Sequence, residues 1–213
     1  MATKDHQSEP IESASETLQR IFDGHGSVLG SQMADESSRY DVLKKTDFPK
    51  PQRTRRIAVA NQKGGVGKTT STVNTAAALA NKGAQVLVID MDPQGNASTA
   101  LGVSHASGEP SVYDVIEGRS DLGDVITVCP DFPTLDVVPA SIDLSGAELE
   151  VADLPNRNTL LKEALDLYLR QSDKHYDYVF IDCPPSLGLL VINAMCAVTE
   201  MLIPIQAEYY ALE

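Results

Sequence analysis

The chain has 213 residues, of which 42% are hydrophobic and 22% charged, a composition typical of a soluble globular protein with one sizeable α/β domain. Its formal net charge of −13 argues against a surface coated in basic residues for nucleic acid, and leaves only a local basic patch for that role. There is no apolar run of about 18 residues and no apolar N-terminal segment, so we expect neither a membrane span nor a secretory signal. The three cysteines form no CxxC pair, which favours reduced thiols in a cytoplasmic protein.

The first fifty residues differ in composition from the rest. They are rich in Ser, Glu, Asp and Gly, contain few apolar runs, and end in Phe48-Pro49-Lys50-Pro51. Residues 1–52 are therefore predicted to be a disordered or weakly structured N-terminal extension, with a short helix around residues 14–22. The domain proper is expected over residues 53–213.

From residue 56 onward, apolar strands and helical stretches alternate along the chain. The strands are predicted over residues 56–60, 85–90, 135–138, 178–182 and 201–205. The helices are predicted over residues 69–81, 111–117, 144–151, 158–169 and 187–198. This alternation predicts an α/β fold of the P-loop NTPase type, a three-layer sandwich whose mostly parallel sheet is covered by helices on both faces.

A glycine-rich loop joins the first predicted strand to the first predicted helix. Phosphate binding needs backbone N–H groups that point inward with no Cβ atoms in the way, and the helix N-terminus adds a positive dipole. Lys68 can reach the β and γ phosphates, and the Thr69 hydroxyl can ligate Mg²⁺. A dinucleotide-binding loop is the competing interpretation, but its third glycine is missing here. The predicted nucleotide-binding residues are Lys63, Gly64, Gly65, Val66, Gly67, Lys68, Thr69 and Thr70.

Carboxylates follow two of the predicted strands. Asp90 and Asp92 stand at the end of the second strand, and Asp182 stands at the tip of the apolar strand over residues 178–182. The carboxyl ends of parallel strands face the same crevice as the phosphate loop. Asp182 is predicted to hold Mg²⁺ through water, as in a Walker B strand. Of Asp90 and Asp92, one can support Mg²⁺ and the other can orient an attacking water, the alternative being a solvent-exposed Asp-Pro turn.

Four stretches resemble one known family. Gln62 stands where the ordinary P-loop has glycine, and Lys63 beside it makes the loop similar to the deviant Walker A loop of the ParA/MinD/iron-protein ATPases. The run Asp90-Met91-Asp92-Pro93-Gln94-Gly95-Asn96 resembles the ParA-type motif D-x-D-P-Q-G-N. The segments at 182–188 and 204–213 are similar to those of ParA/Soj partition ATPases.

This resemblance implies a Mg²⁺- and ATP-dependent switch ATPase that serves chromosome or plasmid segregation. Lys63 would reach the partner's phosphates across an ATP-dependent homodimer, Lys68 would bind phosphate, and Asp92 would position the attacking water. The metal ligands would be Thr69, Asp90 and Asp182. A ParB-type centromere-binding protein would stimulate hydrolysis, and the implied location is the cytoplasm, with nucleoid association if DNA is bound.

Two features depart from the family pattern. Its members continue beyond the position of Glu213 with an adenine-contacting loop, further strands and basic residues for sequence-independent DNA binding, so we expect this chain to be truncated at its C-terminus. They also lack the long N-terminal extension. The basic residues that remain could touch nucleic-acid phosphate or form a solvated linker. These residues are Lys50, Arg53, Arg55 and Arg56.

Three alternatives stay open at this point. A MinD-like membrane-associated ATPase would need an amphipathic tail, and a nitrogenase-type iron protein would need two cluster-binding cysteines in each subunit. A non-catalytic module would bind nucleotide and act by pairing with full-length copies. A turnover assay with Mg-ATP, DNA and partner separates this module from the enzyme.

Overall fold

The computed structural model describes residues 28–207, which fall into two units. The first unit reaches Pro49 and the second begins at Lys50. The domain start at residue 53 stays a prediction, and the second unit begins three residues before it.

The first unit contains a helix where the sequence predicted disorder or weak structure. Helix α2 spans Val28–Lys45 and is mostly exposed. Its residues after Gly30 include neither glycine nor proline, and two lysines in its last turn favour the negative end of the helix dipole. The local sequence therefore permits a helix although it lacks an apolar stripe. The short helix predicted around residues 14–22 lies outside the described residues.

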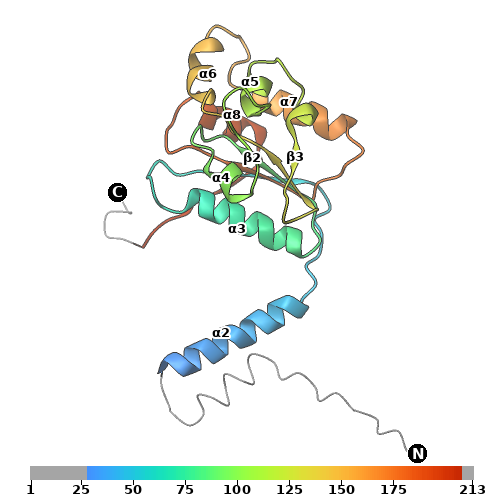
Figure 1. The fold of residues 1–213 in the computed structure, drawn as a ribbon, viewed down its shortest axis with the longest axis vertical. Coiled ribbons are helices and arrows are strands. Elements are labelled where there is room, and N and C mark those ends of the chain that lie inside the picture. Colours follow the sequence, from blue (N-terminus) through green and yellow to red (C-terminus); the bar gives the residue numbers. More distant parts are fainter. Residues whose placement is uncertain (1–27, 208–213) are drawn as a thin grey trace, which may run out of the picture. The chain divides into compact units, whose positions relative to one another are not determined.

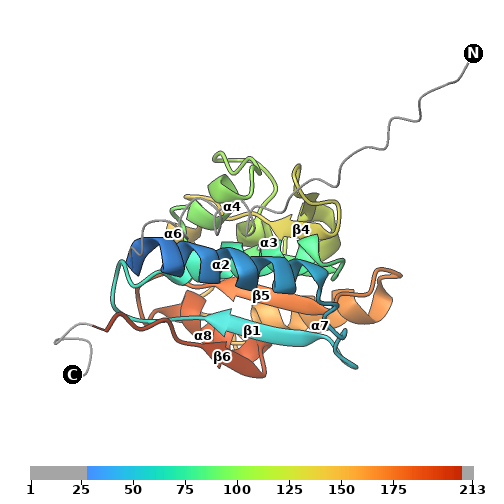
Figure 2. The same ribbon diagram turned by 90° about the horizontal axis from the view of Figure 1, so that it is seen from below.

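The second unit is built on a six-stranded sheet (Figure 1). Its strands are β1 (Arg55–Val59), β2 (Val86–Asp90), β3 (Thr127–Val128), β4 (Leu135–Val138), β5 (Tyr178–Asp182) and β6 (Glu200–Leu202). Their order across the sheet is β3-β4-β2-β5-β1-β6, and β3 alone of these six is antiparallel to its neighbour. Figure 2 shows β1 and β5 pointing the same way. The predicted α/β class with a mostly parallel sheet is confirmed.

Helices cover both faces of this sheet and bury its apolar side chains in two cores. They are α3 (Lys68–Asn81), α4 (Asn96–Ala100), α5 (Val112–Ile116), α6 (Leu144–Glu150), α7 (Leu160–Gln171) and α8 (Leu189–Ala197), with the 3-10 helix η1 over Leu122–Val125. Figure 1 shows α3 on one side of the sheet and α5 to α8 on the other. In β2, Val86 and Val88 join the core beside α3, while Leu87 and Ile89 join the core beside the other helices.

The predicted strands and helices of the domain are all present; the strands over residues 135–138 and 178–182 keep their predicted ends, and the others shift at one end or both. The last strand differs most, since β6 ends at Leu202 and was predicted to continue to residue 205. Three short elements, α4, η1 and β3, were not predicted. Within residues 28–207, every helix is too short or too polar to cross a membrane.

Candidate phosphate and magnesium site

The strand register brings the predicted site residues to one edge of the sheet. Val59 at the end of β1 lies opposite Asp182 at the end of β5, and Asp182 lies opposite Asp90 at the end of β2. The loop between β1 and α3 starts from this edge. Phosphate loop and carboxylates therefore meet at the carboxyl ends of the strands, as the sequence predicted.

The loop that leads into α3 depends on glycine. Gly65 has φ +75° and Gly67 has φ +91°, backbone conformations that side chains with a Cβ rarely adopt. Gly67 is the residue immediately before α3, a helix of 14 residues. The first N–H groups of a helix lack partners within it, so these amides and the positive helix dipole point toward the loop. This is the geometry of a phosphate-binding helix N-terminus.

Lys68 folds back over the loop. Its ammonium Nζ donates to the carbonyl of Lys63 at 3.2 Å, and the residue is 7% exposed. Lys68 and the glycines of the loop line a common hollow. Lys63 itself is exposed at the front of the loop.

Asp182 is held by two hydroxyls of α3. The Thr69 hydroxyl donates to Asp182 Oδ2 at 2.7 Å, and the Thr72 hydroxyl lies 3.0 Å from Oδ1. Burial raises the pKa of Asp182 to about 6; the Thr69 hydrogen bond opposes that shift, and the neighbouring Asp90 carboxylate adds to it. Thr72 was not identified from the sequence, because a threonine four residues after Lys68 carries no recognised signal.

Asp90 and Asp92 occupy different environments. Asp90 is fully buried, where its Oδ2 accepts hydrogen bonds from Ser98 N and Oγ at 2.8 and 2.7 Å, and its Oδ1 accepts one from Asp92 N at 3.2 Å. Burial raises its pKa. Asp92 is 9% exposed, and its Oδ1 accepts a hydrogen bond from Gln94 N at 3.0 Å. Asp92 thus reaches the surface of the site while Asp90 lies behind it, and the role of Asp90 as a metal ligand stays a prediction.

Most of the residues predicted to bind nucleotide line one hollow of about 390 Å³. Its wall contains Gly64, Gly65, Gly67, Lys68, Thr69, Thr70 and Asp92, together with Gln94, Asn96 and Pro185. The last three were not assigned from the sequence, although Gln94 and Asn96 belong to the motif that follows Asp92. Val66 is buried beside the loop. The hollow combines a cation, backbone amides, a hydroxyl and a carboxylate, which suits a polyphosphate with its counter-ion.

The segment after β6 forms hydrogen bonds with the phosphate loop. Asn61 Oδ1 accepts the Lys63 amide at 2.9 Å, and Asn61 Nδ2 donates to the Pro204 carbonyl at 2.9 Å. Gln206 Nε2 donates to the Gly65 carbonyl at 3.1 Å. Sequence reasoning missed both amides because their partners lie about 140 residues away, which no local spacing can show.

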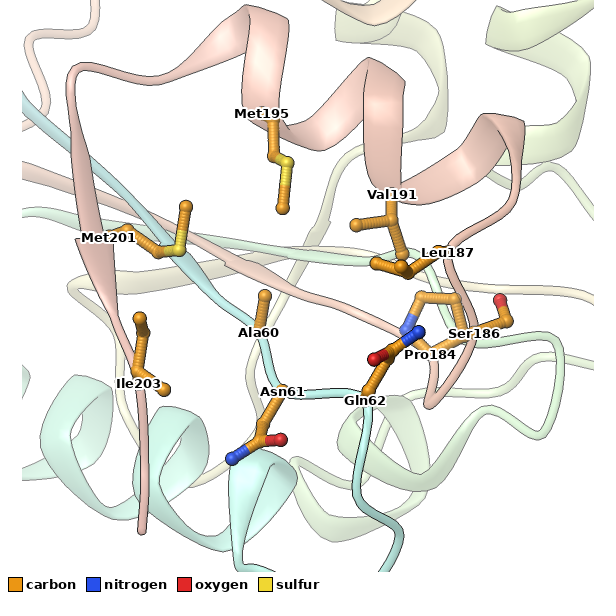
Figure 3. Close-up of a pocket in the computed structure, with 10 residues that line it drawn as sticks. All are labelled: Ala60, Asn61, Gln62, Pro184, Ser186, Leu187, Val191, Met195, Met201 and Ile203. Atoms are coloured by element: carbon orange, nitrogen blue, oxygen red, sulfur yellow. The ribbon is translucent and has the colours of Figure 1, made fainter. Parts of the chain in front are cut away.

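A second hollow, of about 240 Å³, lies beside the loop between α8 and the ends of β1 and β6 (Figure 3). Figure 3 shows Met195 of α8 and Met201 of β6 pointing into it, with Leu187 closing one side and Asn61 pointing away. None of the residues within 28–207 that line it is charged, so these residues offer neither an acid nor a base to the phosphate site.

Three of the four basic residues considered for nucleic acid are ion-paired. Arg55 and Arg56 begin β1, at the opposite end of that strand from the phosphate loop. The pairs are Lys50 with Asp177, Arg55 with Glu200, and Arg56 with Asp166. Each of these three cations has a carboxylate partner with which a nucleic-acid phosphate would compete, and the side chains of Lys50 and Arg55 remain exposed to solvent.

Comparison with known proteins relates most of the second unit to nucleotide-binding proteins. Residues 54–213 match the family model described as AAA domain. The sporulation initiation inhibitor protein Soj of Bacillus subtilis is 50% identical over 157 residues, which cover 74% of this chain and 60% of that protein. The chromosome partitioning protein ParA of Caulobacter vibrioides is 46% identical over 74% of this chain and 58% of its own length. The chain thus spans about 60% of the length of these relatives.

Solved structures agree with this assignment. Cobyrinic acid a,c-diamide synthase from Mycobacterium smegmatis, with bound ADP and magnesium, has a TM-score of 0.66 and 40% identity over 73% of this chain and 61% of its own. A putative plasmid partition protein from Borrelia burgdorferi bound to AMPPNP has a TM-score of 0.65 and 28% identity. The match covers 76% of this chain and 66% of that protein's chain. The chain therefore belongs to the AAA domain family and is a homologue of the Soj and ParA chromosome-partitioning ATPases.

Proposed function

We propose that the chain hydrolyses the γ-phosphate of Mg-ATP and works as a dimerising switch in the segregation of chromosomes or plasmids. The observation that carries the proposal is the hollow in which Lys68, Thr69 and Asp92 meet beside the glycine loop. The names of the chromosome partitioning protein ParA and of the plasmid partition neighbour support the segregation role, and the nucleotides bound by the two structural neighbours support the substrate class.

The phosphates of ATP would lie on the loop amides and the N-terminus of α3. Gly65 and Gly67 let the backbone turn its N–H groups toward the phosphates, and Lys68 would place its ammonium against the β and γ phosphates. These contacts need no rearrangement of the glycines, since their left-handed conformations are already formed. Lys68 is therefore expected to govern nucleotide affinity.

The residues beside the hollow fit magnesium. Mg²⁺ prefers oxygen ligands and is commonly held by one or two carboxylates together with substrate phosphates. The Thr69 hydroxyl and the Asp182 carboxylate, 2.7 Å apart, supply such donors. Among the described residues, no group of three or more His, Cys, Asp or Glu could hold a metal alone, so a metal here would depend on phosphate oxygens and water as well. Bound with ATP, magnesium would neutralise charge on the β and γ phosphates.

Asp92 would act on the attacking water. Its Oδ1 is occupied by the Gln94 amide, and we assign Oδ2 to accept a hydrogen bond from the water. Phosphoryl transfer depends mostly on positioning and electrostatics, so a single well-placed carboxylate is sufficient for slow intrinsic turnover. A ParB-type partner would raise that turnover.

In an ATP-dependent homodimer, Lys63 of one protomer would contact the phosphates bound by the other protomer. It is exposed at the front of the loop, and its likeness to the family's signature lysine supports a contact with the partner's phosphates. Sequence-independent binding of DNA at residues 50–56 would have to compete with the carboxylates that pair with Lys50, Arg55 and Arg56.

The test is phosphate release by the purified chain with Mg-ATP, alone and with DNA and a ParB-type partner. Lys68→Ala should lose nucleotide binding, because the phosphates lose their cation. Asp92→Ala should keep binding and lose hydrolysis, and Lys63→Ala should keep monomeric binding and lose the ATP-dependent dimer. Lys82→Ala, at the far end of α3, is the control for removing a lysine. A folded wild-type chain that binds nucleotide without any turnover would instead be the non-catalytic module.

A further inference from the structure

A buried hydrogen-bond network lies behind Asp92. Asp90 and Ser98 both have no exposed surface. Ser98 donates to Asp90 Oδ2 through its amide at 2.8 Å and its hydroxyl at 2.7 Å. The same hydroxyl oxygen accepts the Ala140 amide at 3.1 Å. One serine thus joins the end of β2, helix α4 and the loop that follows β4.

This network reaches the hollow through the backbone of Asp92. Asp90 Oδ1 accepts the Asp92 amide at 3.2 Å, and the Asp92 carbonyl accepts the Gly95 amide at 2.8 Å. The Gln94 amide then holds Asp92 Oδ1 at 3.0 Å. The direction of the Asp92 carboxylate is therefore set by a turn whose first amide is fixed by Asp90.

The Ser98 hydroxyl has a double role in this network because it is donor and acceptor at once. Without it, Asp90 would keep two of its three donors, and the Ala140 amide would lose its acceptor in a buried place. A buried carboxylate depends strongly on its hydrogen bonds, since water does not replace those that are lost. Asp90 is then expected to shift, and the Asp92 amide with it.

We propose that Ser98 is a positioning residue which, through Asp90, fixes the turn that directs the Asp92 carboxylate into the hollow. Asp90 belongs to the same network and accepts the hydrogen bond from the Asp92 amide directly. The catalytic part of this inference rests on the proposed function, since it concerns the residue assigned to the water. The structural part, that Ser98 holds the Asp90 carboxylate which accepts the Asp92 amide, does not depend on hydrolysis.

Hydrogen exchange of the full chain without nucleotide tests the structural part. In the wild type, the amides of Asp92, Ser98 and Ala140 should exchange slowly. In Ser98→Ala, exchange at Asp92 should accelerate at least about tenfold, as expected when a buried hydrogen bond is removed. Ser98→Thr keeps the hydroxyl and should retain most of the protection.

Ser111→Ala is the matched control. Ser111 is also a buried hydroxyl-bearing residue, but its partner is Asp114 in the first turn of α5. This control should lose stability without any faster exchange at Asp92. Unchanged exchange at Asp92 in Ser98→Ala, or equal acceleration in Ser111→Ala, overturns the proposal.

Steady-state kinetics with Mg-ATP tests the catalytic part. Ser98→Ala should lower kcat by about tenfold or more while KM for ATP stays within about twofold, because the loop amides and Lys68 are untouched. Ser98→Thr should recover kcat. A rise in KM with unchanged kcat contradicts positioning of Asp92. If the wild type shows no turnover, the proposed function fails, and the exchange result still decides the role of Ser98.

Asp90→Asn keeps the inference testable if Ser98→Ala does not fold. The amide oxygen can still accept from Ser98, but the amide N–H₂ group then faces the Asp92 N–H, and two donors cannot bond to each other. Faster exchange at Asp92 is again expected. An Asp90→Asn chain with wild-type exchange at Asp92 contradicts the network.

Discussion

Replacing Thr72 with valine tests how the Asp182 carboxylate is held. Valine has nearly the same shape, so no cavity forms, and the change removes a hydroxyl that lies 3.0 Å from Asp182 Oδ1 and 3.0 Å from the Lys68 carbonyl. A hydrogen bond to a charged group contributes about 1.5–3 kcal/mol. The single hydroxyl proton is shared between two acceptors, so the loss should fall near the lower end, about 1–2 kcal/mol.

Urea unfolding of the magnesium-free chain measures this loss. For a chain of this size, each kcal/mol also lowers the Tm by roughly 2–4 °C. The control is Thr75→Val, an exposed position on the same helix, which should change the free energy of unfolding by less than about 0.5 kcal/mol. A Thr72→Val chain as stable as that control would show that the hydroxyl does not support Asp182.

Three further predictions concern buried groups around the two cores. Tyr176→Phe removes the hydroxyl that donates to buried Asp136, and should cost about 1.5–3 kcal/mol in thermal or urea unfolding; a neutral change contradicts that bond. Gly95→Ala forces a Cβ at φ +64° to within 2.5 Å of the His105 ring, and should lower stability by about 1–3 kcal/mol, which calorimetry would measure; wild-type stability refutes that crowding. Burial raises the pKa of Cys183 to about 12, so iodoacetamide at pH 8 should label it far more slowly in the folded chain than in urea, and equal labelling by mass spectrometry would contradict its burial.

The elements that the sequence predicted well are those with a local cause. The strands β2 and β5 are continuous apolar runs because both faces of a parallel sheet are covered, and each ends in an aspartate. The phosphate loop depends on the spacing of Gly65, Gly67 and Lys68, which lie within four consecutive residues. Such features can be predicted from the sequence because residues that are close together along the chain determine them.

The features that escaped prediction depend on distant partners. Thr72 and Asp182 are 110 residues apart, and Ser98 lies 42 residues from Ala140, so no spacing rule connects them. Helix α4 has only five residues, and the buried bonds of Ser98 to Asp90 hold it in place. The same bonds explain why Asp90 lies behind the site, although its place at the carboxyl end of β2 predicted that it would face the crevice of the phosphate loop.

Release of phosphate from Mg-ATP by the wild type and by Asp92→Ala, with nucleotide binding measured on the same samples, tests the central claim most directly. We expect both proteins to bind ATP and turnover to be lost in the variant alone. Equal turnover in the two proteins would contradict the assignment of Asp92, and a wild-type chain that neither binds nor hydrolyses ATP would contradict the site itself.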